Sequence, residues 1–178
     1  MMIQPKSLFL LAFDVDGVLT DGSLYYGPQG EAYKCFSARD GMGISLARLA
    51  GFKTAIITGR ISDMVKWRAA DLGIDYIYQG VENKLIALQS LCRQIGIEVS
   101  QVAYMGDDIN DMAVLKACQY SGAPADACKE VRKIASWVST YPGGKGAVRE
   151  WIEYLLRQEK RWERVLQQYE DYRSDVRQ

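Results

Sequence analysis

Two clusters of acidic side chains each follow a short apolar stretch. Asp14 and Asp16 come directly after Leu8–Phe13. The second cluster follows Gln101–Tyr104 and contains three carboxylates, those of Asp107, Asp108 and Asp111. Carboxylates this close together repel one another and need a cation or a shared proton. Each cluster alone could cap a turn or a helix start, but together they make an oxygen-rich site for a hard cation such as Mg²⁺.

Two other segments contain groups that could bind an anion. Thr58 closes the apolar stretch that begins at Lys53 and offers a hydroxyl, and the amide of Gly59 can point at an anion. Lys84 lies at the expected start of a helix. A lysine there is ordinarily a solvated surface residue. Beside a metal ion, however, it could neutralise a phosphate oxygen.

These groups together meet the needs of phosphate ester hydrolysis. A phosphate monoester hydrolyses very slowly unaided, so a catalyst must stabilise a strongly charged transition state. A carboxylate nucleophile divides the reaction into formation and hydrolysis of an acyl phosphate, while a metal ion and a lysine screen the phosphate charge. A second carboxyl group must protonate the leaving oxygen and then activate water. The residues that supply these parts are Asp14, Asp16, Thr58, Lys84 and Asp107.

The composition excludes several alternatives. The 178 residues contain no His, which rules out a Ser-His-Asp triad, a histidine general base and histidine-ligated zinc. The 22 basic and 22 acidic residues balance, so no broad basic field exists for nucleic acid or an anionic membrane. The four Cys are scattered, as in proteins of a reducing compartment. Leu8–Phe13 is too short to span a membrane and lacks the pattern of a signal peptide, so we expect a cytoplasmic protein.

Short apolar stretches alternate with helical patterns along the chain. The expected strands are Leu8–Phe13, Lys53–Thr58, Tyr76–Tyr78 and Gln101–Met105. The expected helices are Gly41–Ala50, Ser62–Leu72, Asn83–Ile95 and Asn110–Cys118. Asp40 and Ser62 are the expected N-caps, and Gly51, Gly73 and Gly96 the expected helix ends. This alternation predicts an α/β fold, a doubly wound parallel sheet, with both acidic clusters at the carboxyl ends of strands, where ligands bind.

Two segments depart from this alternation. Residues 24–36 predict two strands about a Gly-Pro-Gln-Gly turn, a β-hairpin inserted after the first strand. From Gly146 to about Tyr172 no helix breaker occurs, so we expect one long C-terminal helix. Its apolar stripe could pack on the sheet, but so long a helix would run past a domain of this size. We therefore interpret Trp162–Tyr169 as a partner surface. The expected domain spans residues 1–157, with the hairpin at about 20–36 and a helical extension over 158–178.

The four motifs occur in the order typical of the haloacid dehalogenase superfamily of phosphohydrolases, which the chain resembles. They are Asp14-Val15-Asp16-Gly17-Val18, Thr58-Gly59, Lys84 and Gly106-Asp107-Asp108 with Asp111. The resemblance implies a Rossmann-like fold with Asp14 as nucleophile and Asp16 as general acid and base. It implies that Thr58 and Lys84 bind the phosphoryl group. It also implies Mg²⁺ held by Asp14, the Asp16 carbonyl and Asp107, with Asp108 and Asp111 in support.

From about Leu8 to Leu156 the chain is similar to one family within that superfamily, the 3-deoxy-D-manno-octulosonate 8-phosphate phosphatases. The segments that carry this similarity are Asp16–Gly22, the Tyr-Gly-x-x-Gly-Glu hairpin, Phe36–Gly41, Ile56–Arg60 and Gly143–Glu150. The similarity implies hydrolysis of a small sugar-acid phosphate by a capless homotetramer whose hairpins line the subunit contacts. The spacing agrees, because 43 residues between Asp14 and Thr58 and 22 between Lys84 and Asp107 leave no room for a lid domain.

Arginines near these motifs are candidates to bind the carboxylate of a sugar acid, since Arg binds carboxylates through two hydrogen bonds. They are Arg60, Arg68 and Arg39, with Gly59 and Asn110 as further candidates for substrate binding. Solvated helix cations are the ordinary alternative for Arg60 and Arg68. Arg60 favours an octulosonate substrate, because the relatives that cleave nonulosonate 9-phosphates tend to have an acidic residue there.

Two other functions are consistent with parts of the pattern. A signalling receiver domain also uses Asp, Thr and Lys on a doubly wound sheet, but it has no counterpart of Asp16. A non-catalytic tetramerisation domain, related to sugar-acid cytidylyltransferases, would not need the charges of Asp14, Asp16, Lys84 and Asp107 together. We therefore predict a Mg²⁺-dependent phosphatase that acts on a sugar-acid phosphate through a phosphorylated Asp14.

Overall fold

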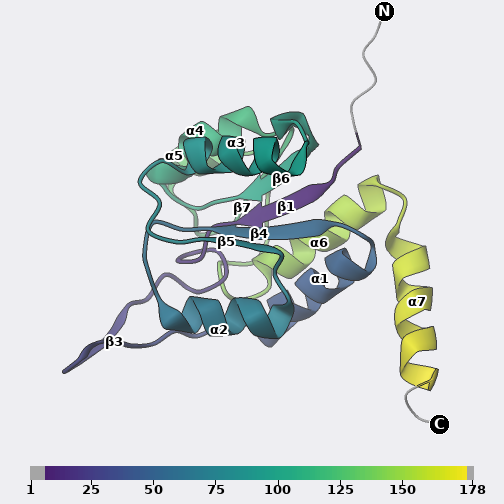
Figure 1. The fold of residues 1–178 in the computed structure, drawn as a ribbon, viewed down its shortest axis with the longest axis horizontal. Helices are drawn as coiled ribbons and strands as arrows, with labels where there is room; N and C mark the ends of the chain where they lie inside the picture. The colour runs from purple at the N-terminus through teal and green to yellow at the C-terminus, as the bar shows by residue number, and fades with distance from the viewer. Residues whose placement is uncertain (1–6, 176–178) are drawn as a thin grey trace, which may run out of the picture.

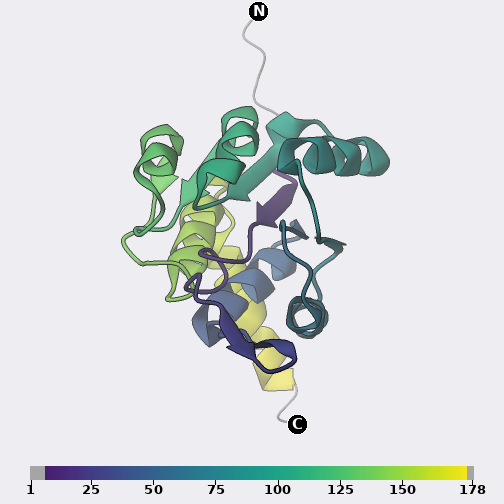
Figure 2. The same ribbon diagram turned by 90° about the vertical axis from the view of Figure 1, so that its left-hand side faces the viewer.

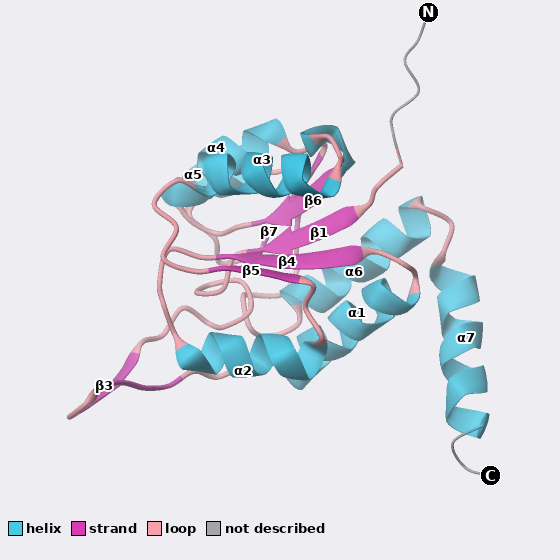
Figure 3. Cartoon of the chain, in the orientation of Figure 1, coloured by secondary structure: helices cyan, strands magenta, loops and turns pink. Residues whose placement is uncertain are grey.

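A six-stranded parallel sheet forms the centre of the molecule (Figures 1 and 3). The computed structural model describes residues 7–175. The strand order is β5-β4-β1-β6-β7-β8, and every neighbouring pair is parallel. The first strand of the chain therefore lies inside the sheet, between β4 and β6. The strands are β1 (Leu10–Phe13), β4 (Lys53–Ile57), β5 (Tyr76–Tyr78), β6 (Val102–Met105), β7 (Tyr120–Ala123) and β8 (Trp137–Val138).

Helices cover both faces of this sheet, which confirms the predicted doubly wound α/β fold (Figure 1). Each face has its own hydrophobic core, one around Phe13 and Trp151 and the other around Leu88 and Tyr104. The first face carries α1 (Ala38–Leu49), α2 (Asp63–Leu72) and α6 (Ala147–Gln158). The second carries α3 (Lys84–Ile95), α4 (Met112–Ala117) and α5 (Lys129–Ile134). Short 3-10 turns at Val99–Gln101 and Ile109–Asp111 flank β6.

The N-cap expected at Asp40 is wrong. The N-cap of α1 is Ser37, whose side chain accepts a hydrogen bond from the Asp40 amide. The Asp40 carboxylate instead caps another helix, because its two oxygens accept from the amides of Gly146 and Arg149 in the first turn of α6. A carboxylate is stabilising at a helix N-terminus, so one side chain ties α1 to α6. Ser62 does precede α2, although its side chain makes no capping hydrogen bond.

Three elements in the last third were missed by the sequence patterns, namely β7, α5 and β8. The segment of β7, Tyr-Ser-Gly-Ala, has neither the β-branched nor the aromatic run that marks a strand. Its small residues are required by packing, since a Cβ on Gly122 would lie 2.6 Å from the Trp151 ring. The close approach of this ring from α6, on a neighbouring layer, explains why Gly occupies a buried strand.

The predicted hairpin is present and projects from the body on the side where the sheet strands end (Figures 1 and 2). It consists of β2 (Tyr25–Gly27) and β3 (Gly30–Tyr33), which pair antiparallel. Tyr25 and Tyr33 stack with their ring centroids 4.6 Å apart. Tyr26 and Tyr33 remain mostly exposed, so the hairpin presents aromatic surface to its surroundings.

The single long C-terminal helix is wrong, because the chain turns at residues 159–161. Lys160 adopts φ 55, the left-handed conformation that often ends helices. The amide of Arg161 reaches back to the Leu156 carbonyl, and α7 (Trp162–Asp175) then runs alongside the body (Figure 1). The left-handed conformation costs a non-glycine residue about 1 kcal/mol, which the packing of α7 must offset.

The partner surface expected at Trp162–Tyr169 is therefore also wrong in its main part. Trp162 and Val165 are buried in the core that contains Phe13. Arg161 donates a hydrogen bond to the Ala50 carbonyl and lies over the Phe52 ring. The apolar stripe of α7 thus covers the chain's own α1, which the predicted straight helix could not have reached.

Candidate active site

The two acidic clusters meet at one edge of the sheet because their strands are neighbours. Phe13 at the end of β1 pairs with Met105 at the end of β6, and the chain continues from these residues into the two clusters. One carboxylate oxygen from each of Asp14, Asp107 and Asp111 lies within 4.8 Å of the others. Carboxylates from distant parts of the sequence therefore converge, as the sequence patterns predict for the carboxyl ends of parallel strands.

Lys84 lies between two of these carboxylates. Its ammonium is 2.6 Å from Asp14 Oδ2 and 2.7 Å from Asp111 Oδ1, and its side chain is 2% exposed. Burial alone would lower the pKa of Lys84, but the charges and hydrogen bonds of Asp14 and Asp111 outweigh it and raise this pKa. Lys84 is therefore a charged donor fixed beside Asp14.

Asp111 positions the second cluster. Its Oδ1 accepts from Lys84 and, at 2.7 Å, from the hydroxyl of buried Tyr104. Its Oδ2 accepts from the amides of Asp107 and Asp108. Since both oxygens are already engaged by protein donors, Asp111 holds Lys84 and the Asp107 loop in place. Tyr104 was not identified from the sequence, where it looks like any other apolar strand residue.

One oxygen of the Asp107 carboxylate lacks a partner. Its Oδ1 is buried without a hydrogen bond. Burial, together with the charges of Asp14 and Asp111, raises the pKa of Asp107 to about 8. Burial and Asp111 likewise raise the pKa of Asp14 to about 6 against the opposing effect of Lys84. A buried oxygen without a hydrogen bond costs free energy, and so does the repulsion between neighbouring carboxylates. A hard cation bound here would reduce both costs. The residues present therefore fit Mg²⁺.

A cleft of about 260 Å³ opens over these groups. Buried Thr58 lies on it at the end of β4, directly beside β1 in the sheet. Most residues singled out from the sequence thus share one cavity. The lining consists of Asp14, Asp16, Gly22, Thr58, Gly59, Arg60, Asp107, Asp108 and Asn110.

Asp16 has partners that sequence reasoning missed. Lys34, just after β3, places its ammonium 2.5 Å from Asp16 Oδ1 and 2.9 Å from Glu31. Arg60 Nε is 3.7 Å from the other oxygen of Asp16, and the Arg60 guanidinium donates to the Tyr26 hydroxyl at 2.6 Å. The sequence did contain a signal for these contacts, namely the charged residues Glu31 and Lys34 in an otherwise aromatic hairpin. The hairpin is thus linked to the cleft by two side chains.

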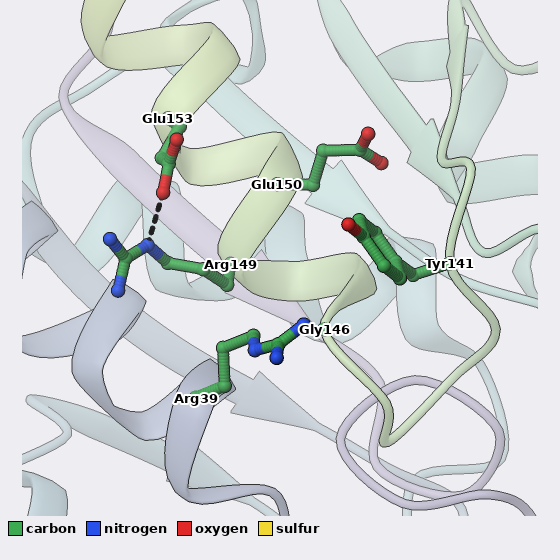
Figure 4. Close-up of a pocket in the computed structure, with 6 residues that line it drawn as sticks. All are labelled: Arg39, Tyr141, Gly146, Arg149, Glu150 and Glu153. Atoms are coloured by element: carbon green, nitrogen blue, oxygen red, sulfur yellow. Dashed lines mark hydrogen bonds and ion pairs between the residues drawn. The ribbon is translucent and has the colours of Figure 1, made fainter.

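The other two candidate arginines lie elsewhere. Neither Arg39 nor Arg68 lines the cleft. Arg68 donates to the Ser37 carbonyl and lies over the Phe36 ring, between α2 and the start of α1. Arg39 lines a separate cavity of about 420 Å³, where its guanidinium lies 5.8 Å from the centre of the Tyr141 ring and Arg149 pairs with Glu153 (Figure 4).

A glycine-rich segment from the far end of the chain closes over the first acidic loop. The amide of Gly144 donates to the Val18 carbonyl. A Cβ on Gly143 would lie 1.8 Å from the Gly17 carbonyl oxygen, so no side chain fits there. The loop that follows Asp14 and Asp16 is therefore held from outside by residues 143 and 144.

The comparisons with known proteins agree with this geometry. The profile of haloacid dehalogenase-like hydrolases matches residues 73–152. The 3-deoxy-D-manno-octulosonate 8-phosphate phosphatase of Escherichia coli K12 is 44% identical over 86% of this chain and 81% of its own length. The enzyme of the same name from Yersinia pestis is 42% identical over 86% and 82%.

Solved structures give the same result. The phosphatase of that name from Moraxella catarrhalis, in complex with magnesium, phosphate and its sugar acid, superposes with a TM-score of 0.88 at 38% identity, covering 91% of this chain and 93% of that one. The cobalt-bound enzyme from Haemophilus influenzae gives 0.85 at 40% identity, covering 88% and 91%. The chain therefore belongs to the haloacid dehalogenase-like hydrolases, in the family of the 3-deoxy-D-manno-octulosonate 8-phosphate phosphatases.

Proposed function

We propose that this chain is a Mg²⁺-dependent phosphatase that hydrolyses 3-deoxy-D-manno-octulosonate 8-phosphate to the free sugar acid and phosphate. The observation that carries the proposal is the convergence of Asp14, Asp107 and Asp111 on one another within 4.8 Å, with an unpartnered buried oxygen on Asp107. Relatives that bear this activity in their names match more than four fifths of the chain.

In the first step, a carboxylate oxygen of Asp14 attacks phosphorus while the bond to the sugar oxygen breaks. Asp16 gives its proton to that leaving oxygen, and Asp14 becomes an acyl phosphate. In the second step, Asp16 takes a proton from water, which attacks phosphorus and releases phosphate and free Asp14. Lys84 and Thr58 bind phosphoryl oxygens and balance the charge that develops on them.

The metal ion would be held by Asp14, the carbonyl of Asp16 and Asp107, with Asp108 and Asp111 in support. Bound Mg²⁺ neutralises charge on the phosphoryl group that would otherwise repel the attacking carboxylate. The arrangement fits this role because Lys84 is a single positive charge among three close carboxylates. A second positive charge is needed before a phosphate dianion can approach.

For the sugar acid, Arg60 is the best placed of the candidate residues, since it lines the cleft with Gly59 and Asn110. Its guanidinium would bind the substrate carboxylate. Arg39 and Arg68 lie outside the cleft of their own chain, so they would reach a substrate only across a subunit contact. A nonulosonate 9-phosphate is the alternative substrate, with the same phosphoryl chemistry.

We further infer a cytoplasmic homotetramer that binds neither nucleic acid nor a membrane. Four large apolar side chains, Tyr26, Tyr33, Ile61 and Trp67, are exposed and offer apolar surface for a second copy. No helix within residues 7–175 has the length and apolar character to cross a membrane. The four free cysteines suit a reducing compartment. Light scattering across a dilution series tests the assembly, and a monomeric mass throughout would contradict it.

The activity is tested by measuring phosphate release from a panel of substrates, each with Mg²⁺ and with excess chelator. The panel contains the octulosonate 8-phosphate, a nonulosonate 9-phosphate and a simple hexose phosphate. We expect Mg²⁺-dependent release with the highest kcat/KM for the octulosonate ester. Equal rates for all three would contradict the substrate, and no release from any would leave a non-catalytic domain as the better description.

A further inference from the structure

The side chain of Lys34 is buried against Asp16, a residue that lines the cleft. Its side chain is 1% exposed, although it follows an otherwise exposed hairpin. A lysine is almost never fully buried unless it is paired, and this one has two carboxylate partners, Asp16 Oδ1 at 2.5 Å and Glu31 Oε1 at 2.9 Å. The ammonium therefore forms a fixed bridge between the hairpin and a residue of the cleft.

The two partners give Lys34 one contact, that with Glu31, which does not depend on the charge of Asp16. An ammonium donates to Oδ1 of an ionised carboxylate and, more weakly, to the carbonyl oxygen of a neutral carboxyl group. Glu31 meanwhile remains beside Lys34 as a counter-charge. The bridge can thus hold Asp16 in the same orientation before and after a proton leaves it. The second oxygen, Oδ2, lies 3.7 Å from Arg60 Nε, and both residues line the cleft.

We propose that Lys34 is a positioning residue that holds Asp16 by Oδ1, so that Oδ2 exchanges protons with the leaving oxygen and then with water. The inference rests on the proposed function, in which Asp16 protonates the sugar oxygen as its bond to phosphorus breaks. Proton transfer of this kind requires the donor within hydrogen-bond reach of the leaving atom. Small displacements of the donor are costly.

The alternative role for Lys34 is to tie down the hairpin alone, and leaving groups distinguish the two. A sugar alkoxide must be protonated as it departs, whereas a nitrophenolate departs well without a proton. The ratio kcat/KM includes steps only as far as departure of the leaving group, so the later attack of water does not enter it. Loss of positioning should therefore affect the two esters differently, and loss of the hairpin should affect them alike.

The test is the variant Lys34→Met, assayed with the sugar-acid phosphate and with p-nitrophenyl phosphate. We expect kcat/KM to fall by about 30-fold or more for the sugar ester and by less than about threefold for the nitrophenyl ester, given the usual contribution of a general acid. Lys34→Arg should recover part of the loss. Lys66→Met is the matched control, since Lys66 is exposed on α2, where its ammonium pairs with Asp63; both rates should stay at the wild-type level.

Removing Lys34 leaves Asp16 and Glu31 facing each other, which could prevent folding. The double variant Glu31→Gln, Lys34→Met removes that repulsion and should show the same difference between esters. Equal losses for both esters, or no loss for either, would overturn the inference while the wild-type activity stands. A wild-type chain that hydrolyses neither ester would overturn the proposed function itself, and the inference with it.

Discussion

The ammonium of Lys84 lies 2.6 Å from the carboxylate of Asp14, and both groups are buried. In the free protein, this lysine is the nearest positive charge to the proposed nucleophile. It also contacts Asp111, so it remains paired if Asp14 is modified. Formation of a phosphorylated Asp14 would therefore leave Lys84 in place as a partner for the new phosphoryl oxygens.

Replacement of the nucleophile should separate activity from folding. We expect Asp14→Asn to reduce phosphate release below detection, because the amide cannot form the acyl phosphate. The variant should fold at least as well as the wild type without metal at about pH 8, since it removes one of three crowded carboxylates. Phosphate assays and thermal unfolding measure the two effects. Turnover at the wild-type rate would refute the assignment of Asp14.

The crowded carboxylates should make the stability of the metal-free protein depend on pH, and Mg²⁺ should change that dependence. The pKa of Asp107 is raised from 3.8 to about 8 and that of Asp14 to about 6. These two groups therefore bind more protons in the folded state without metal than in the unfolded state, so their contribution to the free energy of unfolding falls as pH rises from about 4 to about 8. Mg²⁺ should stabilise the protein much more at about pH 8 than at about pH 5, where protons compete with it.

Thermal unfolding with chelator and with Mg²⁺ at both pH values measures this effect. Asp107→Asn is the control, because without the titrating carboxyl the metal-free protein should lose most of its pH dependence. An equal shift by Mg²⁺ at both pH values would contradict the prediction.

The hydrogen bond between Tyr26 and Arg60 should affect substrate choice. We expect Tyr26→Phe to raise KM for the sugar-acid phosphate by about fivefold, since a single exposed hydrogen bond contributes about 1 kcal/mol. A phosphate ester without a carboxylate should keep its KM. Tyr33→Phe in the same hairpin is the matched control, because Tyr33 is also exposed and its ring stacks on Tyr25. An equal change in KM for both esters would argue against Arg60 as the carboxylate ligand.

The packing of α7 should contribute to the stability of each subunit. Trp162 is 9% exposed within the main core, so Trp162→Ala should lower the free energy of unfolding by about 3 kcal/mol. Urea denaturation measures this loss. Glu163→Ala, at an exposed position on the same helix, should change stability by less than about 0.5 kcal/mol. If Trp162→Ala instead left each subunit stable and impaired assembly, the result would support the interpretation of Trp162–Tyr169 as a partner surface.

The sequence predicted the parts of this structure that depend on local patterns. The acidic clusters, Thr58 and Lys84 each sit next to an apolar strand or a helix start, and parallel strands must bring such positions to one edge. The environment of Asp16 could not be predicted this way. Lys34 is 18 residues away, and its contact depends on where the hairpin is placed in the folded chain.

Two other failures have the same physical origin. The strand β7 consists of small residues because the Trp151 ring lies against Gly122, a constraint set by a distant helix. The turn at Lys160 has no breaker in its sequence. It exists because burial of Trp162 and Val165 on the body stabilises the bent chain. In both places tertiary packing overrides the local preference.

The contact of Gly143 and Gly144 with the loop after Asp14 has a consequence for how the protein folds during synthesis. The clamp on the loop of the proposed nucleophile is made by residues more than a hundred positions later in the chain. Nascent chains shorter than this therefore cannot complete the catalytic pocket. Competence for turnover is acquired only once Gly144 has joined the fold.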